Sequence, residues 1–142
     1  MNRPAGLAIC STIWDELLRH VDACLPEEAC GFLGGADAMV RLVLPVENAD
    51  HSRTRFRMDP RAQLEGMARL DEPGVSMLGI YHSHPGGPAG LSATDLAEAA
   101  YPEAALVVVS PTAGGWTAHA FLLEGADPRE IPFRIVEGHG DA

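Results

Sequence analysis

Residues 75–95 constrain the fold of this chain more than any other segment, because an apolar run leads directly into a cluster of metal-binding side chains. The run at 75–81 predicts a buried strand, and His82 and His84 follow at its end. Residues two apart on a strand project to the same face, so both imidazoles can reach one ion. Pro85 then ends the strand, because it has no N–H for a sheet hydrogen bond.

Ser92 and Asp95 have the spacing of a helix start. After a loop rich in Gly and Pro, Ser92 is the expected N-cap, and Asp95 lies in the first turn, pointing back toward it. This geometry returns a carboxylate to the strand end where the histidines lie. Two imidazoles and one carboxylate make three protein ligands, the number typical of a catalytic zinc site, whereas structural sites usually have four. The segment therefore predicts one catalytic zinc ion.

Activated water at such a site still needs a group that takes its proton and passes it to the leaving amine. Apart from the ligand Asp95, the motif contains no acid. The nearest candidates upstream are Glu27 and Glu28, in a loop that enters a short apolar strand at Cys30. From the residues alone, either glutamate can fill this role.

Together these residues resemble the motif of the JAMM (MPN-plus) metalloproteases. That motif is a Glu ahead of a short apolar strand, His-x-His-Pro, a Ser separated from the second His by seven residues, and an Asp three residues after that Ser. It is met here without any departure in spacing by Glu28, His82, His84, Pro85, Ser92 and Asp95. The resemblance implies zinc bound by His82, His84 and Asp95. It also implies Glu28 as general acid/base and Ser92 as a donor to the tetrahedral oxyanion.

The order of elements from about residue 7 to residue 137 is similar to that of the small bacterial stand-alone members, most of all to the CysO-cysteine peptidase type. The resemblance therefore implies a zinc metallopeptidase or isopeptidase. Its substrate is expected to be a ubiquitin-like or sulphur-carrier protein, cut after the C-terminal Gly-Gly. The resemblance also allows a homodimer. The alternative is a non-catalytic MPN-type scaffold that binds proteins, although the completeness of the motif argues against it.

Each motif residue also has a structural interpretation. A lone His near an apolar strand is more often a core or loop residue, and Ser-x-x-Asp ahead of a helix is usually only a capping box. Cys30 is close to the proposed site, but a thiol on a strand is more often a small buried hydrophobe. The conjunction of all the motif residues favours the metal site.

Composition and charge exclude several classes of function. A length of 142 residues suits one domain, and 46% apolar with 21% charged residues is typical of a globular protein. The net charge of -10 argues against nucleic acid and against membrane surfaces as partners. Three cysteines without C-x-x-C spacing offer no disulfide framework, and no apolar segment is long enough for export or a membrane span. A cytoplasmic protein is expected.

Residue periodicity predicts helices from residue 11 or 12 to 25, over 59–71 and over 95–100, with strands at 30–33, 39–46, 75–82, 105–110, 116–123 and 131–136. Gly34-Gly35 is interpreted as a turn. The pattern favours an α/β (α+β) single domain over 1–142, with a mixed central sheet, helices on both faces and a disordered tail at 138–142. The resemblance implies a three-layer sandwich related to cytidine deaminase, but the His-x-Glu and Pro-Cys-x-x-Cys sequences of zinc deaminases do not occur here.

Residues 51–58 alternate with period two, which predicts an extended segment with Arg53, Arg55 and Arg57 on one face. On so acidic a chain, these cations are candidates for binding acidic groups of a protein partner. A solvated edge strand protected by its charges explains the pattern equally well.

Overall fold

The computed structural model describes residues 3–97, 99 and 101–138. Within these residues the elements follow in the order β1 (Leu7–Cys10), α1 (Ser11–Cys24), β2 (Cys30–Ala36), β3 (Met39–Val46), α2 (Pro60–Leu70), β4 (Ser76–Ser83), α3 (Ala93–Ala97), β5 (Ala105–Thr112), β6 (Gly115–Glu124), β7 (Asp127–Ile131) and β8 (Phe133–Val136). None of the helices in the described part is long and apolar enough to cross a membrane.

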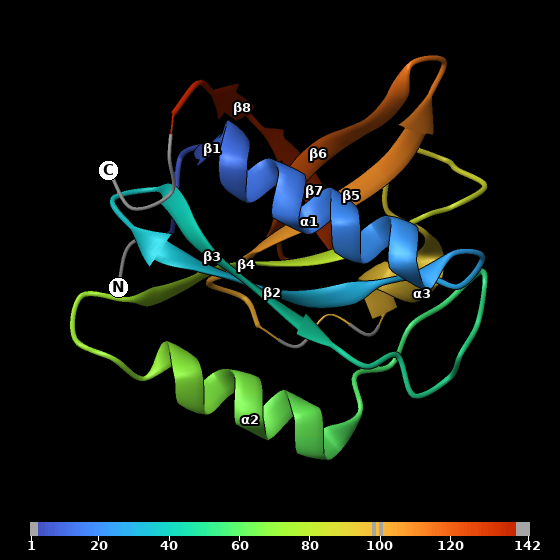
Figure 1. The fold of residues 1–142 in the computed structure, drawn as a ribbon, viewed down its shortest axis with the longest axis horizontal. Helices are drawn as coiled ribbons and strands as arrows, with labels where there is room; N and C mark the ends of the chain where they lie inside the picture. Colours follow the sequence, from blue (N-terminus) through green and yellow to red (C-terminus); the bar gives the residue numbers. More distant parts are fainter. Residues whose placement is uncertain (1–2, 98, 100, 139–142) are drawn as a thin grey trace.

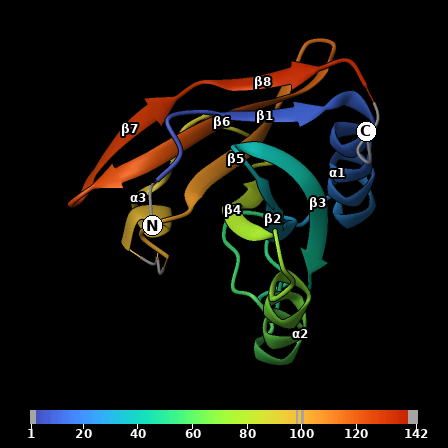
Figure 2. The ribbon, with the colours of Figure 1, turned by 90° about the vertical axis from the view of Figure 1, so that its left-hand side faces the viewer.

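The strands form one mixed sheet in the order β7-β6-β5-β4-β2-β3-β1-β8. The pairs β1–β3, β1–β8 and β4–β5 are parallel, and the others are antiparallel. Figures 1 and 2 show a strongly twisted sheet with α1 and α2 on opposite sides of its centre. The predicted α+β class, with a mixed sheet and helices on both faces, is confirmed.

Alternate residues of the central strands build two separate cores. On β2, Leu33 packs with the α1 side, and Phe32 packs with the α2 side. On β4, Tyr81 belongs to the α1 core and Ile80 to the α2 core. Because side chains alternate along a strand, His82 projects to the same side as Ile80. The predicted histidine ligands therefore emerge on the face of the sheet that α2 covers.

The predicted starts of the first two helices hold, whereas α3 begins at Ala93, two residues before the predicted start at 95. Asp59 caps α2 by accepting a hydrogen bond from the Ala62 N–H at 3.0 Å, with Pro60 as the first helical residue. Apolar spacing on this helix predicts a packed side with Leu64, Met67, Ala68 and Leu70 or Asp71. Leu70 is buried as predicted, but Leu64 is 69% exposed, and Gly66 is the other buried residue of α2.

The prediction of a turn at Gly34-Gly35 is also wrong. Strand β2 runs through both glycines with a register shift, and the hairpin turns at Asp37 and Ala38, whose φ angles are 53° and 62°. A Cβ at Gly34 would lie 2.6 Å from Leu70 Cδ2, and one at Gly35 would clash with the Met39 carbonyl. These glycines therefore serve close packing rather than chain reversal.

The segment at 51–58 is a loop and not the extended strand that its alternation predicts. Only an isolated bridge between Asn48 and Met58 closes it within the described residues. In the predicted tail, Gly138 contacts Ser11 through two hydrogen bonds of 3.3 and 3.4 Å, and the rest of the tail, 139–142, lies outside the described residues.

Candidate active site

The end of strand β4 positions the two histidines. His82 and His84 are 1% and 5% exposed. The His84 N–H donates to the Val109 carbonyl at 2.9 Å, and the Ser83 N–H donates to the Ala29 carbonyl at 3.0 Å. The Ser83 hydroxyl in turn accepts from the Ala29 N–H at 2.8 Å. Main-chain pairing on both sides therefore holds this strand end rigidly.

A reciprocal capping box brings Asp95 to the histidines. The Ser92 hydroxyl accepts from the Asp95 N–H at 3.0 Å, and Asp95 Oδ2 accepts from the Ser92 N–H at 2.8 Å. The same Oδ2 lies 3.1 Å from His82 Nε2 and 3.1 Å from His84 Nε2. The predicted helix start at Ser92 thus also fixes the carboxylate of Asp95.

Three potential ligand atoms form a nearly equilateral triangle, because the two Nε2 atoms are 3.0 Å apart. A tetrahedral zinc site with bonds of about 2.0–2.1 Å places neighbouring donor atoms roughly 3.3 Å apart. The three side chains are at most 6% exposed, and two imidazoles with one carboxylate are typical zinc ligands. The site fits a zinc ion in size and in donor chemistry.

The surroundings of the triangle favour the ionised carboxylate of Asp95 and the neutral imidazole of His82, the protonation states in which these side chains bind a metal. Burial raises the pKa of the Asp95 carboxyl, but hydrogen bonds with His82 and His84 outweigh burial and hold this pKa far below its usual range. Burial lowers the pKa of His82, so its imidazole is neutral at pH 7. Burial also acts to lower the pKa of His84, yet the hydrogen bonds to Asp95 and Pro88 raise it overall.

The two histidines are held in different ways on their outer sides. The His84 Nδ1–H donates to the Pro88 carbonyl at 2.8 Å, which leaves Nε2 free for a metal. His82 Nδ1 is buried and has no hydrogen-bond partner among the described residues. Its ring instead stacks on Phe56, with centroids 4.7 Å apart and an interplanar angle of 24°. Phe56 therefore orients His82 by ring packing.

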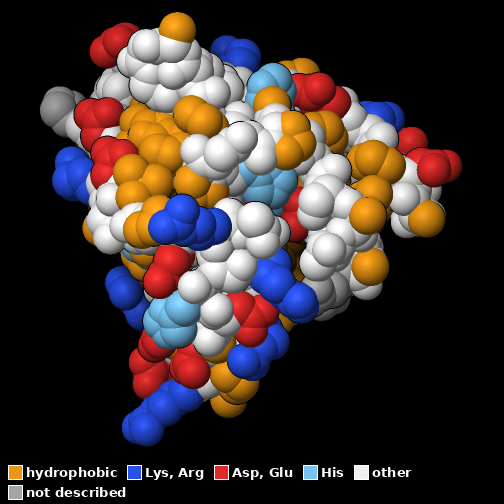
Figure 3. Space-filling model, turned by 90° about the vertical axis from the view of Figure 1, so that its right-hand side faces the viewer, with side chains coloured by type: hydrophobic (Ala, Val, Ile, Leu, Met, Phe, Trp, Pro, Cys, Tyr) orange, Lys and Arg blue, Asp and Glu red, His pale blue; other side chains and the backbone are white. Residues whose placement is uncertain are grey.

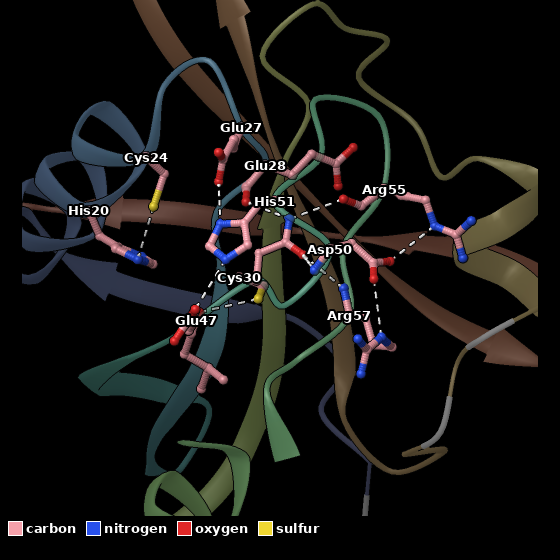
Figure 4. A network of polar contacts seen from close by, with 12 residues as sticks. His20, Cys24, Glu27, Glu28, Cys30, Glu47, Asp50, His51, Arg55 and Arg57 are labelled. Atoms are coloured by element: carbon pink, nitrogen blue, oxygen red, sulfur yellow. Dashed lines mark hydrogen bonds and ion pairs between the residues drawn. The ribbon is translucent and has the colours of Figure 1, made fainter. Parts of the chain in front are cut away.

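Glu28 lies at the site, whereas Glu27 faces away from it. Glu28 is 2% exposed and offers a ligand atom within 4.8 Å of those of His82 and His84, and its Oε1 has no hydrogen-bond partner in the described part of the chain. Glu27 bonds to His51 on the surface at 3.1 Å, as Figure 4 shows. Asp95 Oδ2 lies 3.1 Å from each Nε2 atom, whereas Glu28 forms with the two histidines a wider group of potential metal ligands, so Asp95 completes the tighter candidate ligand set.

Burial raises the pKa of Glu28 to about 7, with a further rise from Asp95 and an opposing effect from His84. A carboxyl group of this pKa can both accept and return a proton near neutral pH. This property, together with the unpaired Oε1, suits Glu28 for general acid/base chemistry.

The loop between β3 and α2 holds Glu28 by its main chain. The Glu28 N–H donates to the Ser52 carbonyl at 2.8 Å, and Asn48 Nδ2 donates to the Glu28 carbonyl at 3.1 Å. Asn48 also donates to the Arg55 carbonyl and accepts from the N–H groups of Asp50 and Arg57, each at 3.1 Å. Sequence reasoning missed both Asn48 and Phe56. No local signal separates them from ordinary loop residues, because their partners are distant in the sequence.

Two of the three predicted loop cations are ion-paired. Asp50 bonds to Arg55 at 3.2 Å and to Arg57 at 3.1 Å, and Figure 4 shows its carboxylate between them. Cys30 packs in the core on the α2 side of the sheet. It is fully buried, its thiol donates to the Val46 carbonyl at 3.3 Å, and burial raises its pKa to about 12.

Two hollows adjoin the site. A cavity of about 170 Å³ is lined mostly by apolar side chains and reaches His82 and Asp95. An open hollow of about 770 Å³ reaches Glu28, Arg53, His84 and Ser92. On the face shown in Figure 3, apolar side chains gather beside a recess in which histidine and acidic side chains are visible.

The sequence matches the family of prokaryotic homologs of the JAB domain over residues 11–122. The chain belongs to this family. The JAMM/MPN resemblance is thereby confirmed, and with it a hydrolase of the JAMM type.

Three curated relatives are similar to the chain. A "Probable TtuB-protein conjugate cleaving protease" of Thermus thermophilus is 38% identical over 86 residues, which span 60% of this chain but only 57% of that protein. A "CysO-cysteine peptidase" of Mycobacterium tuberculosis is 33% identical over 73% of both chains. A "Desampylase" of Haloferax volcanii is 35% identical over 78% of this chain and 79% of its own length.

Solved structures agree with the fold. A protein of Desulfitobacterium hafniense superposes with a TM-score of 0.83 at 33% identity, covering 94% of both chains. A JAB1/MPN domain protein of Archaeoglobus fulgidus gives a TM-score of 0.60 over 92% of this chain and all of that one. At 16% identity, the second likeness shows the fold alone.

Proposed function

We propose that the chain is a zinc-dependent metallopeptidase or isopeptidase that hydrolyses the amide bond after the C-terminal Gly-Gly of a ubiquitin-like or sulphur-carrier protein. The observation that carries the proposal is the triangle of His82 Nε2, His84 Nε2 and Asp95 Oδ2, with edges of 3.0–3.1 Å, beside the Glu28 carboxylate, whose Oε1 has no hydrogen-bond partner among the described residues. The relatives named as a CysO-cysteine peptidase, a probable TtuB-protein conjugate cleaving protease and a desampylase support this class of substrate.

His82, His84 and Asp95 would hold the zinc ion. When bound, zinc acts as a Lewis acid that polarises the scissile carbonyl and makes a nearby water more acidic. Ionised Glu28 takes a proton from that water, whose oxygen bonds to the carbonyl carbon of the last glycine. As the C–N bond breaks, Glu28 returns the proton to the departing nitrogen. The products are a carrier that ends in a glycine carboxylate and a free amine.

Ser92 is suited to stabilise the negative charge that develops on the carbonyl oxygen. Its hydroxyl oxygen already accepts from the Asp95 N–H, so its own proton remains free to be donated. Ser92 lines the same open hollow as Glu28 and His84. In this proposal Ser92 supplies an oxyanion hydrogen bond.

The proposal also takes residues 1–142 as one JAMM/MPN domain with its core at about 7–137, located in the cytoplasm and able to form a homodimer. The three cysteines are free thiols, which suits a reducing compartment.

The zinc content of the purified protein, compared with that of Asp95→Ala, tests the proposal. We expect about one zinc ion per wild-type chain and loss of zinc with loss of carrier cleavage in the variant. Asp127→Ala, an exposed carboxylate on β7, is the matched control and should keep both. If wild type holds no zinc even after metal is offered, the non-catalytic MPN-type scaffold becomes the better account.

A further inference from the structure

One arginine lines the open hollow beside the proposed catalytic groups without an ion pair in the described part of the chain. Arg53 is exposed and lines this hollow together with Glu28, His84 and Ser92. In the described part of the chain, no hydrogen bond or ion pair joins Arg53 to another residue. Its neighbour Arg57 is ion-paired to Asp50 at 3.1 Å and lines the other, apolar cavity. The loop therefore directs a single unpaired guanidinium to the Glu28 side of the site.

The position of Glu28 indicates which part of the substrate enters this hollow. Glu28 is the group that returns a proton to the departing nitrogen, so the leaving amine must lie within hydrogen-bond reach of it. If the leaving group is one amino acid at the end of the carrier, its carboxylate is attached to the carbon that bears this amine. If the leaving group is a lysine side chain of a folded protein, no carboxylate accompanies the amine. The two substrate classes thus differ in the charge they bring toward Arg53.

Arginine suits the first class. A guanidinium binds a carboxylate through two parallel hydrogen bonds, which fix orientation as well as charge. The chain carries a net charge of -10, so its overall field disfavours anionic leaving groups unless a local cation compensates. Within the described residues that line the hollow, Arg53 is the only arginine or lysine.

We propose that Arg53 is a specificity-determining residue that binds the α-carboxylate of a single amino acid attached after the carrier's Gly-Gly. The inference rests on the proposed function. It assigns the chain to carriers that end in Gly-Gly-X with a free carboxylate, in preference to lysine-linked conjugates.

The test uses two matched substrates, a ubiquitin-like carrier extended after Gly-Gly by one alanine that ends either in a carboxylate or in a carboxamide. The zinc-loaded wild type should prefer the acid by about tenfold or more in kcat/KM, the size expected for a charge-assisted hydrogen-bond pair. Arg53→Gln should bring the acid-to-amide ratio close to one, Arg53→Lys should keep part of it, and added salt should weaken it. Arg61→Gln, which removes an exposed arginine on α2, should leave the ratio unchanged.

The acid-to-amide ratio compares two substrates with the same enzyme preparation. Incomplete folding or incomplete zinc loading of a variant lowers both values of kcat/KM equally and therefore leaves the ratio unchanged. An unchanged ratio in Arg53→Gln would overturn the proposal. Equal loss on both substrates would place the contact on the carrier body instead, and would overturn it too. If the wild type cleaves neither substrate, the proposed function itself fails and the assignment of Arg53 falls with it.

Discussion

The two sides of the candidate site are held by different kinds of interaction. On the strand side, His82, His84, Ser92 and Asp95 are positioned by main-chain pairing of β4 and by a capping box of adjacent residues. On the loop side, Glu28 and the His82 ring depend on Asn48 and Phe56, which reach across from a loop without regular structure. Regular strand pairing and a local capping box therefore place the predicted ligands, whereas the placement of the proposed general base depends on contacts from an irregular loop.

The largest expected effect concerns Glu28 and separates metal binding on the strand side from proton transfer on the loop side. Glu28→Gln should keep zinc, because the triangle of closest donor atoms comes from His82, His84 and Asp95, but should lower kcat by about 10³-fold, since proton transfer is lost. Zinc content and single-turnover cleavage, followed by intact mass, measure the two properties. Glu27→Gln is the matched control and should stay within a few-fold of wild type, because Glu27 bonds to His51 on the surface. Wild-type turnover in Glu28→Gln would remove Glu28 from the mechanism.

A second prediction concerns pH and the metal-free protein. Burial raises the pKa of folded Glu28 to about 7 from an ordinary 4.5, so the folded state binds more protons than the unfolded state between these values. The contribution of Glu28 is therefore most favourable below pH 4.5 and is lost as the pH rises through 7. Relative to Glu28→Gln, which does not titrate, wild type should become less stable by roughly 2.5 kcal/mol between pH 5 and pH 8.

Denaturant unfolding of both metal-free proteins at these two pH values provides the measurement. A stability difference that does not change with pH would show that the Glu28 carboxyl titrates in the fold as it does in the unfolded chain.

Much of the strand side could be predicted from sequence, because its signals are local. Three signals act through neighbouring residues: the apolar run before His82, the proline at 85 that ends the strand, and the Ser92-x-x-Asp95 spacing. The loop side was largely missed. Alternation at 51–58 resembles a strand, but Asn48 accepts the main-chain N–H of Arg57 and donates to the Arg55 carbonyl, which removes these groups from sheet pairing. The tertiary contacts of Asn48 show that 51–58 is a loop, whereas the local sequence does not.

Gly34 and Gly35 are a second case in which tertiary packing, and not local composition, determines the structure. Gly34-Gly35 has turn composition, yet close approach by Leu70 and Met39 explains both residues, and the turn itself is made by Asp37 and Ala38. Ala38 at a φ of 62° carries no turn signal of its own.

The third prediction concerns Asn48, whose hydrogen bonds hold the loop side together. Asn48→Asp is isosteric but cannot donate to the carbonyls of Glu28 and Arg55, and it places a charge at a position that is 7% exposed. The free energy of unfolding should fall by about 2 kcal/mol, since two acceptors lose their donor. Zinc should remain near one per chain while kcat falls. Arg61→Gln produces the same change in net charge on the surface of α2 and should leave stability and kcat unaltered.

The smallest expected effect concerns Phe56. Phe56→Leu removes the stacked ring from His82, whose Nδ1 has no hydrogen-bond partner among the described residues to hold the imidazole instead. Zinc affinity, measured by competition with a chelator, should weaken by about tenfold. Leu64→Ala, at a side chain that is 69% exposed on α2, should leave zinc affinity as it is. Equal affinity in Phe56→Leu and wild type would show that β4 alone orients His82.

The central claim is that Asp95 is the third ligand and that Glu28 stands beside the metal as the base. An anomalous diffraction map of zinc-loaded crystals, recorded at the zinc absorption edge, tests it most directly. The account predicts one peak within about 2.0–2.2 Å of His82 Nε2, His84 Nε2 and Asp95 Oδ2, with Glu28 outside bonding distance. A peak bonded to Glu28, His82 and His84 with Asp95 displaced, or no peak at this site, would contradict it.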